Sequence, residues 1–270
     1  MQDMLRLGLC SSALLMRSPG EIVAAAAVAG LEAIEWSSES YSSGDGTEAW
    51  GILMTTLRAG LTVASYSALY RAGAGPDSLQ RFRSALDSAS ALHAPNMRIF
   101  AGTSAADLSD PARRATLVQE LSRLGDEAGL RGITLCLSFG RHTGVQDYPA
   151  ALALVSELAH PFVRLAWEAL PGVQASAASA SLEAVGASTA LVVARRLGRD
   201  GAAGSLADDP GEWRRRLAAY RDSEPDPKMG RFVLIGAVGD ASGLGEDASL
   251  ASDAALLREI IAELGATKGA

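Results

Sequence analysis

The feature that most constrains the fold is a repeating order in which short apolar runs of strand length alternate with longer helical stretches. Alternating strands and helices are typical of parallel sheets built from strand–helix–strand units. The pattern predicts eight strands, at Arg6–Cys10, Ala33–Trp36, Thr62–Tyr66, Met97–Ala101, Ile133–Ser138, Val163–Trp167, Ala190–Arg195 and Phe232–Val238.

The stretches between the strands are amphipathic or rich in alanine, and several carry helix-start signals. Ser18, Asp110 and Asp209 each precede a proline, as good N-cap residues often do. The Gly-, Asp- and Ser-rich stretch Gly239–Ser252 is expected to be a loop, and Gln174–Val185 to hold only a short helix. The other expected helices are Pro19–Ala29, Thr47–Ala59, Ser78–Leu92, Pro111–Ala128, Pro149–Leu158, Gly211–Tyr220 and Ala254–Leu264.

Eight strand–helix units in 270 residues predict a single (β/α)8 TIM barrel over residues 1–270, because such barrels typically need about 250 residues. A doubly wound open sheet is the alternative. That fold usually has fewer strands and a glycine-rich first turn, whereas the first turn here is Cys10-Ser11-Ser12. In a barrel, functional residues lie at the carboxyl ends of the strands and in the loops that follow them.

Composition narrows the functional classes. The net charge is −7 and no basic groove is evident, which disfavours nucleic-acid binding. No apolar run reaches the roughly 18 residues of a membrane span, and the apolar start of the chain resembles a first strand more than a signal peptide. Cys10 and Cys136 lie in apolar stretches and are expected to be buried free thiols in a reducing compartment, so we expect a cytoplasmic protein.

The expected strand ends carry two carboxylates of catalytic interest, Glu35 and Glu168. A carboxylate in an apolar barrel mouth can exchange protons near neutrality, because burial disfavours its charged form. The alternative is a buried carboxylate paired with an arginine, and Arg98 on the fourth strand is a suitable partner. The sequence leaves both interpretations open.

The histidines divide between the two ends of the predicted barrel. His93 and His160 precede strands and fall on the end opposite the expected site. His142 follows the fifth strand, so it is a candidate general acid or base, with an exposed loop histidine as the alternative.

Further polar and aromatic residues at the strand ends are candidate substrate-binding residues. Tyrosines that merely pack on the rim are the alternative for the third strand. The aromatic candidates, with Trp36, predict a larger and less polar substrate than a sugar phosphate. The candidates are Tyr41, Tyr66, Tyr70, Arg71, Arg98, Ser138, Phe139, Trp167 and Arg195.

Several segments, taken in order, resemble the sugar phosphate isomerase/epimerase family of xylose-isomerase-like TIM barrels. The first strand–helix–strand unit, the tyrosine-containing stretch after strand three and the ends of strands four and six carry the resemblance. These segments are Leu7-Gly8-Leu9, residues 29–36, residues 65–73, Arg98-Ile99-Phe100-Ala101-Gly102 and residues 160–167.

The resemblance implies a divalent metal held by His, Glu and Asp at the strand ends, but those positions are altered in this chain. Ser138 and Gly140 end the fifth strand, Arg195 the seventh, and Gly236 stands where a glutamate is expected. Glu35 and Glu168 alone would hold Mg²⁺ only weakly. We therefore expect no metal and no cofactor, and room at the mouth beside the small residues.

These observations favour a metal-independent biosynthetic enzyme that isomerises, cyclises or eliminates from a relatively apolar small molecule by acid–base chemistry. A non-catalytic ligand-binding or regulatory barrel is the first alternative. A metal-dependent sugar isomerase or epimerase with unrecognised ligands is the second. The expected partner is a small-molecule substrate, not nucleic acid or a membrane, and a homodimer is left open.

Overall fold

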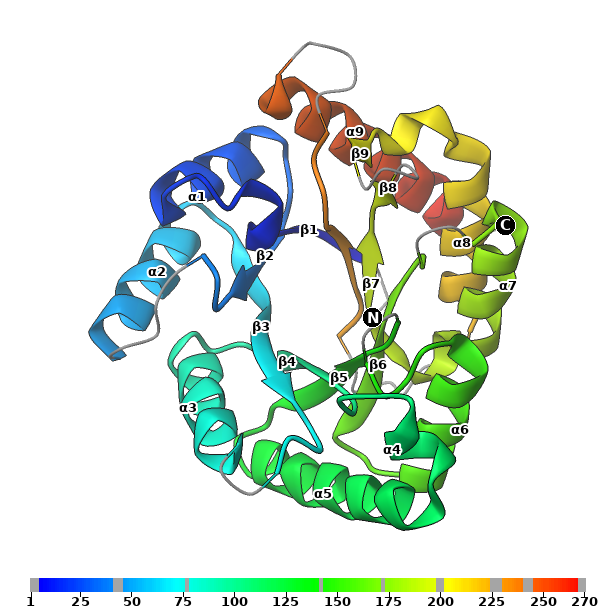
Figure 1. Ribbon diagram of the computed structural model, residues 1–270. Coiled ribbons are helices and arrows are strands. Elements are labelled where there is room, and N and C mark those ends of the chain that lie inside the picture. Colours follow the sequence, from blue (N-terminus) through cyan, green and yellow to red (C-terminus); the bar gives the residue numbers. More distant parts are fainter. Residues whose placement is uncertain are drawn as a thin grey trace.

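The computed structural model describes residues 5–40, 46–75, 78–140, 143–170, 173–197, 202–223, 230–239 and 245–266. Its centre is a closed barrel of eight parallel strands, each paired with its neighbours around the ring (Figure 1). The predicted fold is confirmed. The barrel strands are β1 (Arg6–Cys10), β2 (Ala33–Ser37), β3 (Thr62–Arg71), β4 (Asn96–Phe100), β5 (Thr134–Ser138), β6 (Val163–Glu168), β7 (Thr189–Ala194) and β10 (Phe232–Ile235).

The helices form a ring around the barrel, as Figure 1 shows. A small antiparallel hairpin, β8 (Arg196–Leu197) and β9 (Ala203–Gly204), follows β7 and was not predicted. No helix in the described part of the chain combines the length and apolar character needed to cross a bilayer. The helices are α1 (Pro19–Val28), α2 (Gly46–Arg58), α3 (Ser78–Ala91), α4 (Ala106–Ser109), α5 (Pro111–Gly129), α6 (Tyr148–Leu158), α7 (Ala175–Val185), α8 (Pro210–Asp222) and α9 (Glu246–Ala266).

The three predicted N-caps are confirmed. The Ser18 side chain caps α1 in a capping box with Glu21, Asp110 accepts hydrogen bonds from the first turn of α5, and Asp209 accepts one from Glu212 N of α8. Each cap satisfies backbone N–H groups that have no partner inside the helix. The caps therefore set where these helices begin after their loops.

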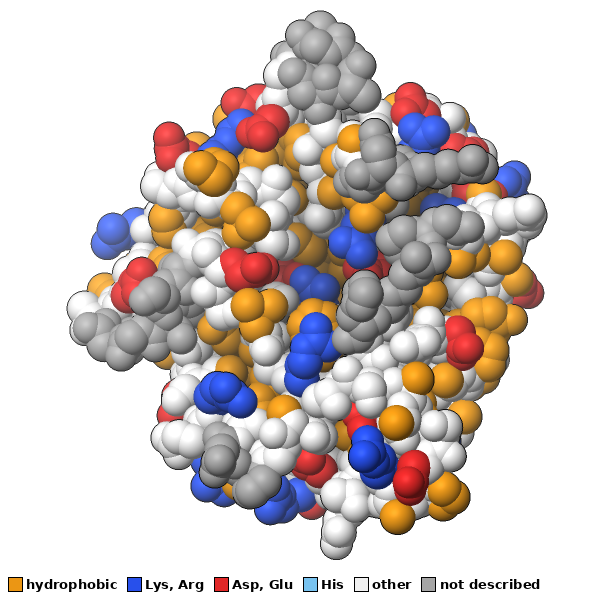
Figure 2. Space-filling view, viewed as in Figure 1, with side chains coloured by type: hydrophobic (Ala, Val, Ile, Leu, Met, Phe, Trp, Pro, Cys, Tyr) orange, Lys and Arg blue, Asp and Glu red, His pale blue; other side chains and the backbone are white. Residues whose placement is uncertain are grey.

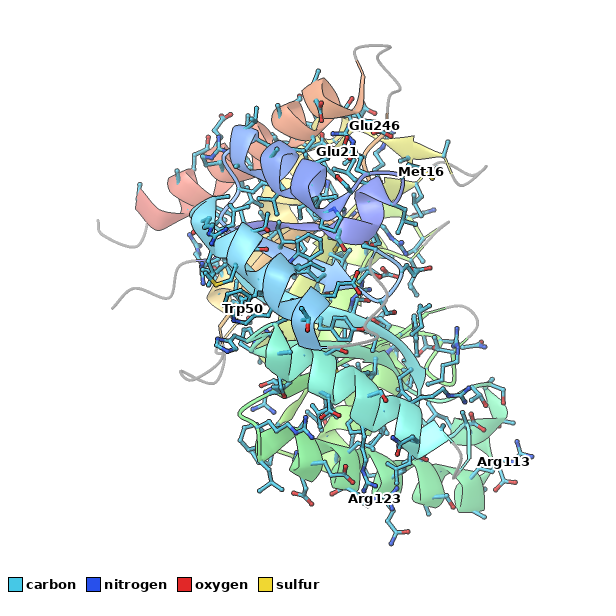
Figure 3. The ribbon with its side chains drawn as sticks, turned by 90° about the vertical axis from the view of Figure 1, so that its left-hand side faces the viewer. Met16, Glu21, Trp50, Arg113, Arg123 and Glu246 are labelled. Carbon is cyan, nitrogen blue, oxygen red and sulfur yellow. The ribbon has the colours of Figure 1, made fainter. Side chains whose placement is uncertain are left out.

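Helix α9 begins eight residues earlier than predicted, at Glu246 instead of Ala254. Glu246 and Asp247 both pair with Arg17, and acidic residues in a first turn also interact favourably with the helix dipole. Figure 3 shows Glu246 at the same end of the molecule as Met16 and Glu21. These long-range contacts stabilise helix in a segment whose composition favours a loop.

The buried side chains form two clusters. The larger one joins the helices to the outer face of the barrel. The smaller one consists only of strand residues and fills the barrel interior, with Cys10, Ala33, Ala64, Cys136, Ala166, Ala190, Leu191, Val193, Phe232 and Leu234. Because successive strand residues point to opposite faces, this division identifies which side chains point into the barrel and which point toward the helices.

Candidate functional site

The first polar feature of the barrel mouth is an ion pair between Glu35 on β2 and Arg98 on β4. Arg98 Nη2 donates to Glu35 Oε1 at 2.6 Å, and Arg98 Nε donates to Glu35 Oε2 at 3.1 Å. The Cys10 thiol on β1 also donates to Glu35 Oε1, at 3.2 Å. The Glu35 side chain is only 1% exposed and that of Arg98 15%. Both oxygens of Glu35 are therefore engaged inside the barrel.

This pair alters the ionisation of its neighbours. Burial, followed by the negative charge of Glu35, raises the pKa of the Cys10 thiol well above its usual value, which keeps Cys10 protonated as a donor. Burial acts to lower the pKa of Arg98, but the charge and hydrogen bond of Glu35, with the charge of Glu168, outweigh it, and the Arg98 pKa is raised. Arg98 is thus a permanently charged group within electrostatic reach of both carboxylates.

A second ion pair lies at the adjoining strand ends. Arg195, directly after β7, donates from Nη2 to Oε1 of Glu168 at the end of β6, over 2.7 Å. The side chains are 26% and 18% exposed, so this pair is more open than the first. Among the described residues, Oε2 of Glu168 accepts no hydrogen bond, and Nε of Arg195 is buried without a partner. The second pair therefore keeps a carboxylate oxygen and guanidinium donors for a ligand.

Two further predicted residues lie at the ends of neighbouring strands, Ser138 on β5 and Arg71 on β3. Ser138 ends β5 on the same strand face as the interior residue Cys136 and is buried. The guanidinium of Arg71 lies over the Phe100 ring, with Cζ 4.5 Å from the ring centroid. Figure 2 views the barrel from the end that bears the strand-to-helix loops, and arginine atoms gather at its centre with carboxylate atoms between them. The mouth is therefore polar and cation-rich.

Tyr66 and Tyr70, predicted as candidate substrate-binding residues with packing as the alternative, point toward the helices and not into the barrel interior. Both belong to the helix-side core. The Tyr70 ring packs against Phe82 of α3, and its hydroxyl donates to Glu120 Oε1 at 2.9 Å. A shift of register between Ile34 and Glu35 of β2 places Tyr66 opposite Trp36. The two tyrosines line a groove of about 460 Å³ together with Ser38, Arg71 and residues of α3.

The aromatic residues after β5 and on β6 also point away from the mouth. Trp167 is fully buried, and its indole N–H donates to Ser181 Oγ of α7 at 2.8 Å. Phe139 belongs to the same helix-side core. Trp36 donates to Thr56 of α2. The placement of these side chains as an apolar substrate lining is therefore wrong, since strand alternation turns them outward.

The small residues at the strand ends do not leave the expected room. A Cβ added at Gly236 would collide with the Val193 side chain, which fills that space. A Cβ at Gly140 would lie 2.8 Å from Leu170 Cδ2, and Gly140 also has φ +143°. These glycines permit close packing, so the mouth is more tightly filled than the sequence indicated.

Two predicted site residues, Tyr41 and His142, lie outside the described residues. His160 lies at the opposite end of the barrel, as predicted, where its ring is 3.1 Å from Asp126 Oδ1. Both cysteines are buried and free, also as predicted.

Sequence reasoning missed the Cys10–Glu35 contact and the Phe100 ring beneath Arg71. Cys10 could have been found from alternation along β1, because it shares a face with Gly8 and thus points inward. Sequence reasoning also missed Arg216 of α8. Its Cζ atom lies 4.8 Å from the centroid of the Trp213 ring and 5.9 Å from that of the Trp167 ring. Helical spacing could have found Arg216, because it lies three residues after Trp213 and four before Tyr220, on the buried face of α8.

No protein-family model matches the chain, and no curated protein matches it. Solved structures match it over almost its full length. The probable 3-DHS dehydratase AsbF, involved in petrobactin synthesis in Bacillus anthracis, has a TM-score of 0.69 and 15% identity, covering 94% of this chain and 99% of that chain. A xylose isomerase domain protein from Planctomyces limnophilus has a TM-score of 0.73 and 12% identity, covering 98% and 99%.

A third match is D-psicose 3-epimerase, solved with D-tagatose, from Clostridium cellulolyticum H10. Its TM-score is 0.70 at 12% identity, and the match covers 95% of this chain and 99% of that chain. The chain has the xylose-isomerase-like TIM-barrel fold. Each match covers nearly the whole of both chains, so the similarity extends over the complete barrel.

Metal ligation, which this fold family implies, does not fit the donors in the described part of the mouth. Both Glu35 oxygens are engaged by Arg98 and Cys10, and Arg195 holds Glu168. No three His, Cys, Asp or Glu side chains among the described residues are grouped so that they could hold a metal ion. A divalent cation would also be repelled by the two guanidinium groups.

Proposed function

We propose that this chain is a metal-independent enzyme that isomerises, cyclises or eliminates from a small anionic molecule at the barrel mouth. Glu168 would exchange the proton, and Arg98 and Arg195 would bind negative charge. The observation that carries the proposal is the Glu168–Arg195 pair, in which one carboxylate oxygen is held and the other accepts no hydrogen bond from a described residue. A carboxylate oriented in this way suits general acid–base chemistry.

Glu168 is a better proton-transfer group than Glu35 for a geometric reason. Glu35 is 1% exposed and both of its oxygens have donors, so a substrate cannot reach it. Glu168 is 18% exposed at the strand end. Glu35 would instead act as a positioning residue that holds the Arg98 guanidinium.

Arg98 would stabilise the charge that develops when a proton leaves carbon next to a carbonyl group. The electron pair left behind moves toward the carbonyl oxygen, and a pre-oriented cation lowers the energy of that oxyanion without reorganising. Arg98 is held by two hydrogen bonds and is already within the field of Glu168. Removal of one such donor typically slows an enzyme by about 10²–10³-fold.

The substrate proposed here is anionic, which differs from the apolar molecule expected from the sequence. The aromatic side chains behind that expectation pack against helices, whereas arginines occupy the mouth. The structural neighbours include a probable dehydratase and an epimerase. Both elimination of water and epimerisation require a proton to leave carbon, and this shared step supports the proposed acid–base role.

The test combines metal analysis with a substrate panel. Purified protein is expected to contain no stoichiometric transition metal and to keep its activity in chelator. The panel covers 3-dehydroshikimate, ketohexoses and small hydroxy and keto acids, assayed by loss of substrate and by exchange of carbon-bound hydrogen in D₂O. Activity lost to chelator and restored by zinc or manganese would establish the metal-dependent alternative instead.

The Glu168→Gln variant then tests the assigned base. It should lower kcat by about 10²–10⁴-fold, the usual contribution of a general base, with little change in the melting temperature. Glu157→Gln, which alters an exposed carboxylate paired with Arg114 on the outer helices, is the matched control and should behave as wild type. Saturable binding of a panel compound without turnover or exchange would favour the non-catalytic alternative.

A further inference from the structure

A small pocket lies beside the barrel mouth, between the segments that follow β6 and β7 and the start of α8. Its volume is about 190 Å³, and three arginines line it, namely Arg195, Arg196 and Arg216. Arg195 belongs to both the mouth and this pocket. Since pockets that enclose whole small ligands span roughly 300–1,000 Å³, this one has room for a single chemical group of a ligand.

Arg216 is unusual because it is buried and incompletely bonded. It is 7% exposed, its guanidinium packs against the rings of Trp213 and Trp167, and its Nε has no hydrogen-bond partner. Buried N–H groups nearly always have a partner, and one left without carries a free-energy cost. The Arg195 Nε, lining the same pocket, is also buried without a partner.

The local carboxylates leave these donors available. Glu212 approaches Arg216 only at 3.5 Å and also contacts Ser179 and Arg215. Asp208 pairs with Arg196 at the rim. Asp209 lines the pocket, but its Oδ1 accepts from the backbone of α8 as the N-cap. Beside the pocket, the Nε groups of Arg195 and Arg216 therefore have no acceptor among the described residues.

We propose that this pocket binds an oxyanion, a phosphate or a carboxylate group, through Arg195, Arg196 and Arg216. Guanidinium groups bind such groups through charge-assisted and often bidentate hydrogen bonds. The Trp213 and Trp167 rings hold Arg216 in place by cation–π contact, so little side-chain freedom is lost on binding. If the proposed function holds, the oxyanion is one end of the substrate, and Arg195 joins its binding to Glu168.

Calorimetric titration with inorganic phosphate and with acetate, at constant ionic strength, tests the pocket without knowledge of the substrate. Wild type should bind at least one of them saturably. Tighter binding of phosphate assigns a phosphoryl group, and equal or tighter binding of acetate assigns a carboxylate. Saturable binding of neither ion would overturn the proposal.

Variants then locate the binding. Arg216→Gln should weaken it at least about tenfold, the loss expected for one charge-assisted hydrogen bond. Arg196→Gln, nearer the rim, should weaken it about threefold and serves if Arg216→Gln does not fold. Arg214→Gln is the matched control, because Arg214 lies on the same helix but pairs with Glu259 and Glu263 outside the pocket. Equal weakening in Arg214→Gln, or none in the pocket variants, would refute the assignment.

The Glu168→Gln variant separates this inference from the proposed function. It removes a negative charge next to Arg195, so it should preserve or strengthen oxyanion binding while activity falls. Activity that survives in Glu168→Gln would overturn the acid–base proposal and leave the oxyanion pocket standing. Loss of phosphate and acetate binding in Glu168→Gln would contradict the pocket.

Discussion

The two ion pairs of the barrel mouth have the same chemistry but different surroundings. Glu35 and Arg98 meet through two hydrogen bonds and are almost fully enclosed, with a protonated thiol as a third partner. Glu168 and Arg195 meet through one hydrogen bond at a partly exposed strand end. The comparison shows that two ion pairs of the same residue types differ in how far solvent or a ligand can reach their carboxylates.

The two pairs also differ in what it costs to separate their charges. A buried charge whose partner is removed is costly, so the Glu35–Arg98 pair holds a cation in a defined position. A partly hydrated pair contributes little to stability, and its groups can exchange partners with a ligand. In the proposed function, the first pair therefore positions a cation and the second pair takes part in the reaction.

The largest expected effect comes from breaking the enclosed pair on one side. Arg98→Met should lower the free energy of unfolding by about 3–5 kcal/mol, because Glu35 is left buried without its cation. Arg195→Met, the matched change in the open pair, should cost at most about 1 kcal/mol, since water can reach Glu168. Urea unfolding at neutral pH measures both. Equal losses would show that the two pairs are not energetically different.

A double variant sharpens the same comparison. Glu35→Leu combined with Arg98→Met removes both charges, so most of the stability lost in Arg98→Met should return. A double variant as unstable as the single one would mean that packing, and not the unpaired charge, explains the loss.

A smaller effect is expected at Tyr70, a candidate substrate-binding residue whose ring packs against α3. Tyr70→Phe removes the hydroxyl that donates to Glu120 and should cost about 1 kcal/mol. Because the ring faces α3, kcat and KM should not change. A raised KM with unchanged stability would return Tyr70 to the substrate site.

The fold was predictable because its signals are local and repeated. Ser18, Asp110 and Asp209 mark helix starts with their own side chains, and each strand is a short apolar run between such signals. The start of α9 was not predictable, because its first turn is stabilised by Arg17, more than two hundred residues away in the chain.

The site was only partly predictable, because side chains alternate between the inside and the outside of the barrel along each strand. The positions at strand ends were found, but a strand-end residue points inward or outward according to a one-residue register. The shift in register between β2 and β3 turns Tyr66 outward beside Trp36 while Glu35 stays inside. Arg98 on the fourth strand was named as a suitable partner for Glu35, and the two side chains do form an ion pair. The contact with Cys10 depends on the register of the adjacent strands β1 and β2, which pairs Cys10 with Glu35, and the sequence does not fix that register.

The smallest effect to be measured is the response of stability to alkaline pH. Burial and the charge of Glu35 raise the folded-state pKa of Cys10 above its usual value of 9.0. Because the folded state holds this proton more tightly than the unfolded chain, the stability it contributes is complete below about pH 9 and declines as the pH rises further. Glu35→Gln removes a cause of the raised pKa of both buried thiols, Cys10 and Cys136, so the decline between about pH 9 and pH 10.5 should become shallower. Glu168 is not among the groups that shift the Cys10 pKa, so Glu168→Gln should keep the wild-type slope. Tyr70, whose pKa burial raises to about 12, contributes equally in all three proteins and cancels from the comparison.

Urea unfolding across this pH range measures the slope for each protein. A shallower slope in Glu168→Gln, with the slope of Glu35→Gln unchanged, would assign the thiol to the open pair instead of the enclosed one.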